Sequence, residues 1–156
     1  MERGALRFWR WGAVALFALG LLIPFPSAAA DLSKEEAVKK VIEKVVLPSS
    51  NRETLRAHFW PHPLRPGDVI TVFRPDGERW PIKEPTWFFW IDDLPEALFG
   101  HPARFVYVDV ATGAITVQRA DSWPALNGET LWGFAEERED PRFVIYPLKR
   151  PGGPGK

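Results

Sequence analysis

The chain has 156 residues, with 20 basic and 20 acidic side chains, a formal net charge of zero and no cysteine. This balance argues against a nucleic-acid partner, whose phosphates require a basic surface, and against electrostatic docking to an anionic bilayer. The absence of cysteine excludes a disulfide framework and a lipid anchor on cysteine, so stability must come from packing.

Residues 1–30 are typical of a secretory signal peptide. Three arginines precede an apolar stretch at residues 12–25, and the alanines at 28–30 supply a small-residue cleavage site. We expect removal of residues 1–30, with cleavage after Ala29 as the alternative, and a protein that is periplasmic or secreted. An uncleaved membrane anchor is the competing interpretation, but these 14 residues are fewer than the roughly 20 that span a bilayer.

Removal of residues 1–30 leaves 126 of the 156 residues, enough for one domain with a modest core. Because the removed segment holds three basic residues and one acid, 17 basic and 19 acidic residues remain. The prediction is an α+β fold, with an N-terminal helix packed on a mainly antiparallel, aromatic-rich sheet. Residues 31–150 should form this single small domain, and residues 151–156 a disordered Pro/Gly tail.

The first element of the exported chain is predicted to be a helix. Ser33 is the expected N-cap, and Glu36 completes a capping box. Apolar residues then recur in pairs at helical period up to residue 46, and charged residues occupy the opposite face. The helix should end before Pro48. Because only one of its faces is apolar, we expect it to pack on a sheet.

The rest of the chain is predicted to form strands and turns. Expected strands cover residues 54–60, 69–73, 86–91, 103–110, 114–118 and 142–146. Turns are expected at Pro75-Asp76-Gly77, at Asn127-Gly128 and at Gly113, which should be left-handed. Residues 92–102 and residues 135–140 should each form a loop or a short helical turn.

The strand at residues 86–91 is strongly aromatic on both faces. Trp87, Phe89 and Ile91 should point to one side of the sheet, and Phe88 and Trp90 to the other. A sheet that is apolar on both faces must be covered on both, and one helix covers only one. Loops of the chain itself are one candidate cover for the second face; they carry Trp60, Trp80, Trp123 and Trp132. A second copy of the chain or a ligand is the other candidate.

A hairpin pattern resembles PepSY-type domains. After the capped helix, residues 105–109 read FVYVD and residues 112–117 read TGAITV. PepSY-type domains are small bacterial extracytoplasmic modules, and the resemblance implies a stand-alone periplasmic inhibitor or chaperone of secreted peptidases. The chain departs from that family in the long aromatic stretch between helix and hairpin.

A longer pattern resembles an uncharacterised domain of secreted bacterial and archaeal proteins. It comprises WFFWIDD at residues 87–93, HPARFV at residues 101–106, Trp123-Pro124 and Asn127-Gly128. The resemblance implies an exported domain class and no particular reaction. The residues expected to contribute to binding are Trp87, Phe89, Trp90, Asp92, Asp93, His101, Arg104, Trp123 and Asn127.

Two histidines are the first candidates for chemistry. His58 and His62, with a carboxylate or a third histidine, are residue types that bind zinc. Because Pro61 and Pro63 flank His62, no regular helix aligns the pair. Histidines in a turn and on the surface are therefore the simpler interpretation.

Two further arrangements involve Asp92, Asp93, His101 and Arg104. Adjacent carboxylates can perform acid–base chemistry when they share a site, but consecutive residues of a strand face opposite ways. His101 and Arg104 together are able to bind an anion or a chain terminus; support of the loop before the next strand is the alternative. No serine stands in a nucleophile elbow, and no glycine-rich phosphate loop is present.

These observations favour an exported, non-enzymatic binding or inhibitory module that acts on another extracytoplasmic protein or peptide. A homodimer is compatible with the two apolar faces, and no cofactor or metal is expected. One alternative is a small metal-dependent hydrolase that uses the histidines and aspartates above. The other is a glycan-binding domain whose exposed tryptophans stack on sugar rings.

Overall fold

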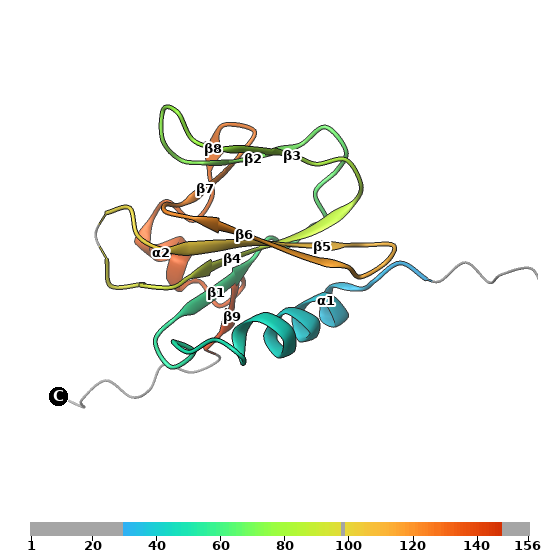
Figure 1. Ribbon diagram of the computed structural model, residues 1–156, viewed down its shortest axis with the longest axis horizontal. Helices are drawn as coiled ribbons and strands as arrows, with labels where there is room; N and C mark the ends of the chain where they lie inside the picture. The colour runs from blue at the N-terminus through green and yellow to red at the C-terminus, as the bar shows by residue number, and fades with distance from the viewer. Residues whose placement is uncertain (1–29, 98, 148–156) are drawn as a thin grey trace, which may run out of the picture.

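Residues 30–97 and 99–147 are described by a computed structural model, and they form three layers (Figure 1). A helix covers one face of a five-stranded antiparallel sheet, and a smaller four-stranded sheet covers the other face. The α+β class is therefore confirmed. Within the described ranges, no helix is long and apolar enough to cross a bilayer. The predicted signal peptide, apart from Ala30, and the predicted tail lie outside the described residues.

The helix begins at the predicted cap. The Ser33 hydroxyl accepts the Glu36 amide at 3.3 Å, and the Glu36 carboxylate accepts the Ser33 amide at 2.9 Å. The helix α1 (Lys34–Val41) continues as one wider π-helical segment, η1 (Ile42–Val46), so it ends close to the predicted position. Its apolar face packs on the sheet, as expected for a helix with one apolar stripe.

The five-stranded sheet has the order β6-β5-β4-β1-β9, and all its pairs are antiparallel. Its strands are β1 (Arg56–Phe59), β4 (Thr86–Asp92), β5 (Ala103–Asp109), β6 (Ile115–Ala120) and β9 (Val144–Tyr146). These strands lie where the sequence predicts them, with ends that differ by one or two residues.

The four-stranded sheet was predicted only in part. It has the order β3-β2-β7-β8 and contains β2 (Val69–Val72), β3 (Arg79–Pro81), β7 (Pro124–Leu126) and β8 (Glu129–Thr130). Strands β3, β7 and β8 are missing from the prediction because two or three residues are too few to show an alternating pattern. The helix α2 (Ala135–Glu139) then occupies the charged segment.

The predicted turns are confirmed by their backbone conformations. Asn127 and Gly128 have φ of 53° and 92° and join β7 to β8, and Gly113 has φ of 67° between β5 and β6. The Pro75-Asp76-Gly77 turn joins β2 to β3. At Gly77 a side chain would meet the Val72 carbonyl, so this turn requires glycine.

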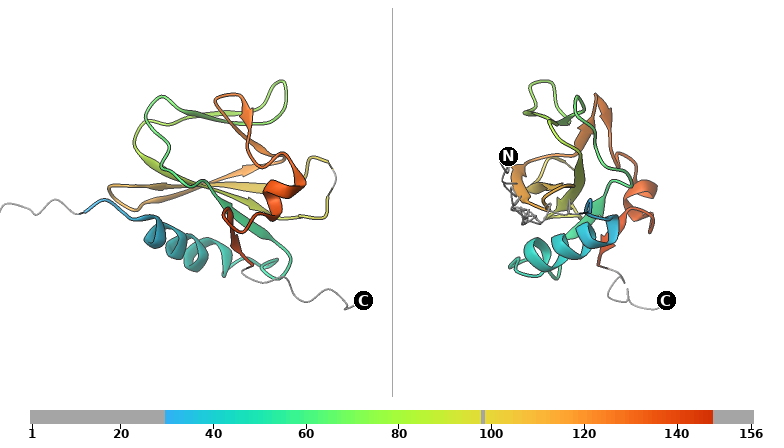
Figure 2. Two further views of the ribbon diagram at one scale, coloured as in Figure 1. Left: turned by 180° about the vertical axis from the view of Figure 1, so that it is seen from behind. Right: turned by 90° about the vertical axis from the view of Figure 1, so that its right-hand side faces the viewer.

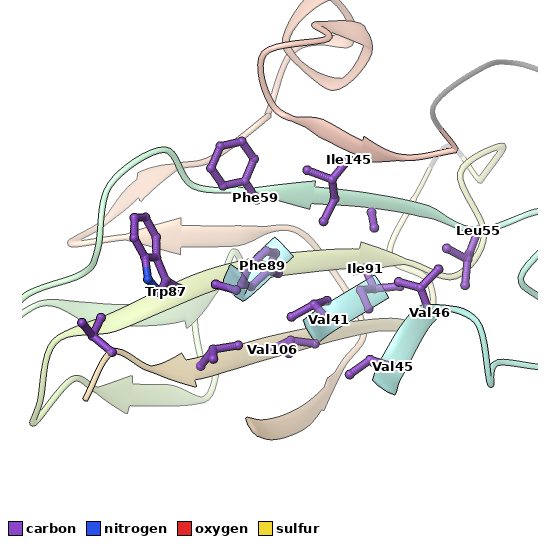
Figure 3. Close-up of a cluster of buried hydrophobic side chains, with 14 residues drawn as sticks. Val41, Val45, Val46, Leu55, Phe59, Trp87, Phe89, Ile91, Val106 and Ile145 are labelled. Atoms are coloured by element: carbon purple, nitrogen blue, oxygen red, sulfur yellow. The ribbon is translucent and has the colours of Figure 1, made fainter. Parts of the chain in front are cut away.

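Two hydrophobic cores flank the five-stranded sheet, and the predicted alternation along β4 is confirmed. Trp87, Phe89 and Ile91 lie in the core beneath the helix (Figure 3), and Phe88 and Trp90 lie in the core between the two sheets. The second face is covered by the chain itself, since Trp132 lies in the second core and the partly buried Trp60, Trp80 and Trp123 pack against it. Full burial of each large apolar side chain contributes roughly 1.5–3 kcal/mol.

Trp132 is central to the second core. Its ring stacks on Trp90 with centroids 5.9 Å apart and on Phe88 at 6.3 Å. Its backbone has φ of 53°, a left-handed conformation that residues other than glycine rarely adopt. Such a conformation costs of order 1–3 kcal/mol and is retained only where the surrounding packing holds the residue in it. The aromatic stack provides that packing.

Candidate functional site

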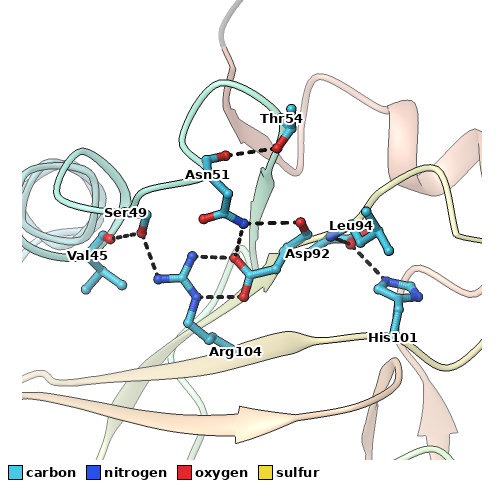
Figure 4. Close-up of polar contacts among 9 residues, drawn as sticks. Val45, Ser49, Asn51, Thr54, Asp92, Leu94, His101 and Arg104 are labelled. Atoms are coloured by element: carbon cyan, nitrogen blue, oxygen red, sulfur yellow. Dashed lines mark hydrogen bonds and ion pairs between the residues drawn. The ribbon is translucent and has the colours of Figure 1, made fainter.

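Four of the predicted binding residues meet where β4 ends and β5 begins (Figure 4). Asp92 is the last residue of β4 and Asp93 follows it, while His101 and Arg104 flank the start of β5. The two carboxylates face different partners, as the alternation of an extended chain predicts. They therefore form two separate pairs.

Asp92 and His101 form a buried pair, with side chains 4% and 3% exposed. His101 Nε2 lies 2.8 Å from Asp92 Oδ1, and Nδ1 lies 2.6 Å from the Phe99 carbonyl oxygen. Because a carbonyl only accepts, Nδ1 donates to it, and Nε2 is engaged by the Asp92 carboxyl. Burial raises the pKa of Asp92. Both imidazole nitrogens are engaged, so neither is open to act as a base or metal ligand.

Asp93 and Arg104 form the second pair, which ties the helix to the sheet. Arg104 Nε and Nη2 donate to the two Asp93 carboxylate oxygens at 2.9 and 2.6 Å. Arg104 Nη1 donates to Ser49 Oγ at 2.9 Å, and Asn51 Nδ2 donates to Asp93 Oδ1 at 2.9 Å. Ser49 and Asn51 follow the helix, so the pair joins three segments. His101 and Arg104 do not form the joint anion site considered from the sequence.

Trp123 lies beside the first of these pairs. Its ring meets the His101 ring edge-on with centroids 5.5 Å apart, and the Arg138 guanidinium carbon lies 5.7 Å from its centroid. These contacts attach α2 to the loop between β4 and β5. Trp123 therefore supports the loop that holds His101.

The binding role expected for Trp87, Phe89 and Trp90 requires correction. Their exposed fractions are 8%, 0% and 0%, so they belong to the cores and have no surface to offer a partner. The Trp87 indole N–H donates to the Leu32 carbonyl at 2.9 Å, which fixes the segment before the helix. The aromatic pattern thus marks a strand between two cores.

Asn127 has a turn-forming role away from the other predicted residues. Its side-chain oxygen accepts the Val69 amide and its nitrogen donates to Asp68, both at 2.9 Å. These bonds hold the β7–β8 turn against the start of β2. Asn127 therefore belongs to the second sheet.

The two candidate zinc ligands lie in different environments. His58 is fully buried in β1, with Nε2 3.0 Å from the Arg138 carbonyl oxygen, whereas His62 is exposed. Burial lowers the pKa of His58 to about 4. Across the described part of the chain, no group of three or more histidines and carboxylates is placed to hold a metal ion.

A cleft at the other end of β4 and β5, lined by none of the predicted binding residues, was missed from the sequence. It has a volume of about 400 Å³ and lies between the β3–β4 connection and the β5–β6 hairpin. One wall carries Trp80, Lys83 and Glu84, and the floor carries Tyr107, Thr116 and Gln118. One sequence feature indicated the cleft. Thr116 and Gln118 alternate along β6 and place polar side chains on the same face of the sheet as Tyr107 and Phe105.

Polar groups surround an aromatic centre in this cleft. The Trp80 ring meets Phe105 edge-on with centroids 5.4 Å apart and is only partly buried. Hydrogen bonds from the Thr112 hydroxyl and amide lower the pKa of Asp109, another lining residue. Aromatic walls with a few acceptors are typical of small ligand sites.

No protein-family model, curated protein or solved structure matches the chain.

Proposed function

We propose that the protein is an exported, non-enzymatic binding module that holds a segment of another extracytoplasmic protein or peptide in the cleft beside β3 and β6. The cleft is the observation that carries the proposal. It brings the partly buried Trp80 ring together with hydroxyl, amide and carboxylate groups. The Asp109 and Glu84 side chains favour a ligand that brings hydrogen-bond donors.

A binding role is favoured over a reaction because the polar groups near β4 and β5 are already engaged. Both His101 nitrogens have partners, and the Arg104 guanidinium holds Asp93 and Ser49. These groups stabilise the loop and the helix end. A hydrolase would require at least one of them to release its partner before contacting a substrate.

Export is the second part of the proposal. It rests on the signal-like residues 1–30. After their removal, α1 would be the first element of the periplasmic or secreted chain. The resemblance to PepSY-type domains agrees with such a module and stays a prediction.

A glycan is the second candidate ligand, and Trp80 is the observation that favours it. Indole rings bind the apolar faces of sugars, while carboxylate and amide groups bind their hydroxyls. Gln118, Glu84 and Asp109 line the same cleft as Trp80. The cleft therefore offers both kinds of contact to a sugar.

The test is a calorimetric titration of the protein with two panels of probes. One panel contains synthetic peptides from unfolded exported proteins, and the other contains cell-wall oligosaccharides. Gln118→Arg places a long side chain in the cleft and should weaken binding at least tenfold. Glu129→Arg, an exposed position of β8, is the matched control and should bind like the wild type.

The titration distinguishes a peptide ligand, an oligosaccharide ligand and the absence of a ligand in the cleft. Peptide binding that Gln118→Arg removes supports the protein-segment proposal. Oligosaccharide binding with the same sensitivity favours the glycan candidate instead. Absence of binding in both panels, or binding that Gln118→Arg leaves unchanged, would contradict a role for the cleft in ligand binding.

A further inference from the structure

The long open edge of the five-stranded sheet is strand β6. The edge strands of the two sheets are β6, β9, β3 and β8, with 6, 3, 3 and 2 residues. Natural proteins usually keep edge strands short or protect them with proline and charge. β3 follows this rule with Pro81. β6 contains no proline, and Arg119 is its one charged residue.

The backbone of β6 offers hydrogen bonds on its open side. The Asp109 amide donates to the Ala114 carbonyl at 3.0 Å, and pairs such as Tyr107↔Thr116 and Phe105↔Gln118 follow it in register. Because bonding alternates in antiparallel ladders, the backbone groups between these positions point away from β5. They belong to Ile115, Val117 and Arg119. No other strand of the described chain pairs with them.

The side chains of β6 add an apolar contact at its centre. Val117 is 43% exposed, although it is a large aliphatic residue on a strand. It lies on the helix side of the sheet, opposite Val106 of β5. An exposed valine at the middle of an unprotected edge is a feature that a partner strand would cover.

We propose that β6 pairs antiparallel with β6 of a second copy of this chain, about a two-fold axis at Val117. In this register Val117 lies opposite Val117 of the second copy, and Ile115 lies opposite Arg119. Thr116 lies opposite Gln118 on the other face of the sheet. All three outward-facing residues of each strand then exchange backbone hydrogen bonds.

Other registers of the two β6 strands form fewer backbone hydrogen bonds or bring like charges together. A shift of the strand by two residues leaves one outward-facing residue of each copy without a β6 partner. Pairing centred on Arg119 also brings two like charges directly opposite each other, which is destabilising. The register centred on Val117 avoids like charges and covers the exposed valine twice. This self-complementarity favours a second copy over an unrelated strand.

The pairing would join the two five-stranded sheets into one continuous sheet. A two-fold axis perpendicular to the sheet keeps both helices on one side and both four-stranded sheets on the other. The right-hand view of Figure 2 shows the β5–β6 hairpin at the lateral edge of the layers, where this pairing would occur. The two clefts, floored by Thr116 and Gln118, would then open toward each other.

A charge-exchange experiment at Val117 tests the proposal. Light scattering of the processed protein, residues 31–156, should give a dimer mass. Val117→Glu and Val117→Lys should each be monomeric, because like charges meet on the axis, and their mixture should restore the dimer. A monomeric wild type at about 100 μM would overturn the proposal. Dimers of both single variants would overturn it as well.

A cysteine at the same position provides a second test that does not disturb folding. The chain has no cysteine, so Val117→Cys introduces the only thiol. In the proposed register the two Val117 residues form a hydrogen-bonded pair, whose Cα atoms are about 5.5 Å apart and so within disulfide range. Oxidation should give a covalent dimer for Val117→Cys and none for the control Glu129→Cys. Equal yields for both variants, or none for Val117→Cys, would contradict the register.

Discussion

At the scale of single residues, His58 shows how burial changes the chemistry of a side chain. It stacks on Trp90 with ring centroids 4.8 Å apart, and its Nε2 bonds the Arg138 carbonyl. That carbonyl only accepts, so Nε2 carries the proton, and Nδ1 is buried with no partner among the described residues. The imidazole is therefore held neutral, with Arg56 and Arg138 further opposing a positive charge and Glu139 favouring it.

The pKa of His58 predicts a loss of stability in acid. The unfolded chain binds a proton near pH 6.5, whereas the folded protein binds it only near pH 4. Between these values the unfolded state holds more protons, so stability falls as the pH is lowered through this window. The full difference is worth about 3 kcal/mol.

Urea unfolding at pH 7 and pH 4.5 measures this effect. His58→Gln keeps a donor for the Arg138 carbonyl but cannot take up the proton, so its stability should depend much less on pH than that of the wild type. His62→Gln changes an exposed histidine and should retain the wild-type slope. Equal slopes for His58→Gln and the wild type would mean that other groups cause the acid sensitivity.

At the scale of elements, the helix was predictable because local signals define it. The Ser33 and Glu36 capping box and the apolar period need no information from distant residues. The pairing of Asp92 with His101 was not predictable, because it depends on how the loop between β4 and β5 folds back. The sequence predicted that both residues contribute to one binding site, but it did not indicate the hydrogen bond between them.

The capping box should contribute measurably to the stability of the protein. Ser33→Ala removes the hydroxyl that accepts the Glu36 amide and should lower the free energy of unfolding by about 1 kcal/mol. Ser50→Ala, at an exposed position after the helix, should change it by less than about 0.5 kcal/mol. Denaturant unfolding at neutral pH compares the two variants. Equal effects would show that the capping box does not contribute measurably.

At the scale of the whole molecule, the sequence predicted the helix, the main sheet and the need to cover both its faces. It did not predict that a second sheet provides the cover, because β3, β7 and β8 are too short to show a pattern. The cleft was missed for the same reason. One wall of the cleft is formed by β3 and the residues just after it, and the floor is formed by β5 and β6.

This architecture indicates which surface is available to a ligand. Trp87, Phe89 and Trp90, which the sequence suggested for binding, are buried in the two cores. The Asp–His and Asp–Arg pairs hold the loop and the helix end. The cleft between the sheets keeps its polar side chains facing solvent-accessible space. The central claim is that a ligand binds in this cleft and leaves the polar pairs intact.

Amide chemical-shift mapping of the ¹⁵N-labelled protein, titrated with the tightest-binding probe of the two panels, tests this claim most directly. We expect shifts concentrated at residues 80–86 and 107–118, with the signals of Asp92, His101 and Arg104 unchanged. Shifts centred on residues 92–104, with the cleft unaffected, would contradict it and would place function at the polar pairs.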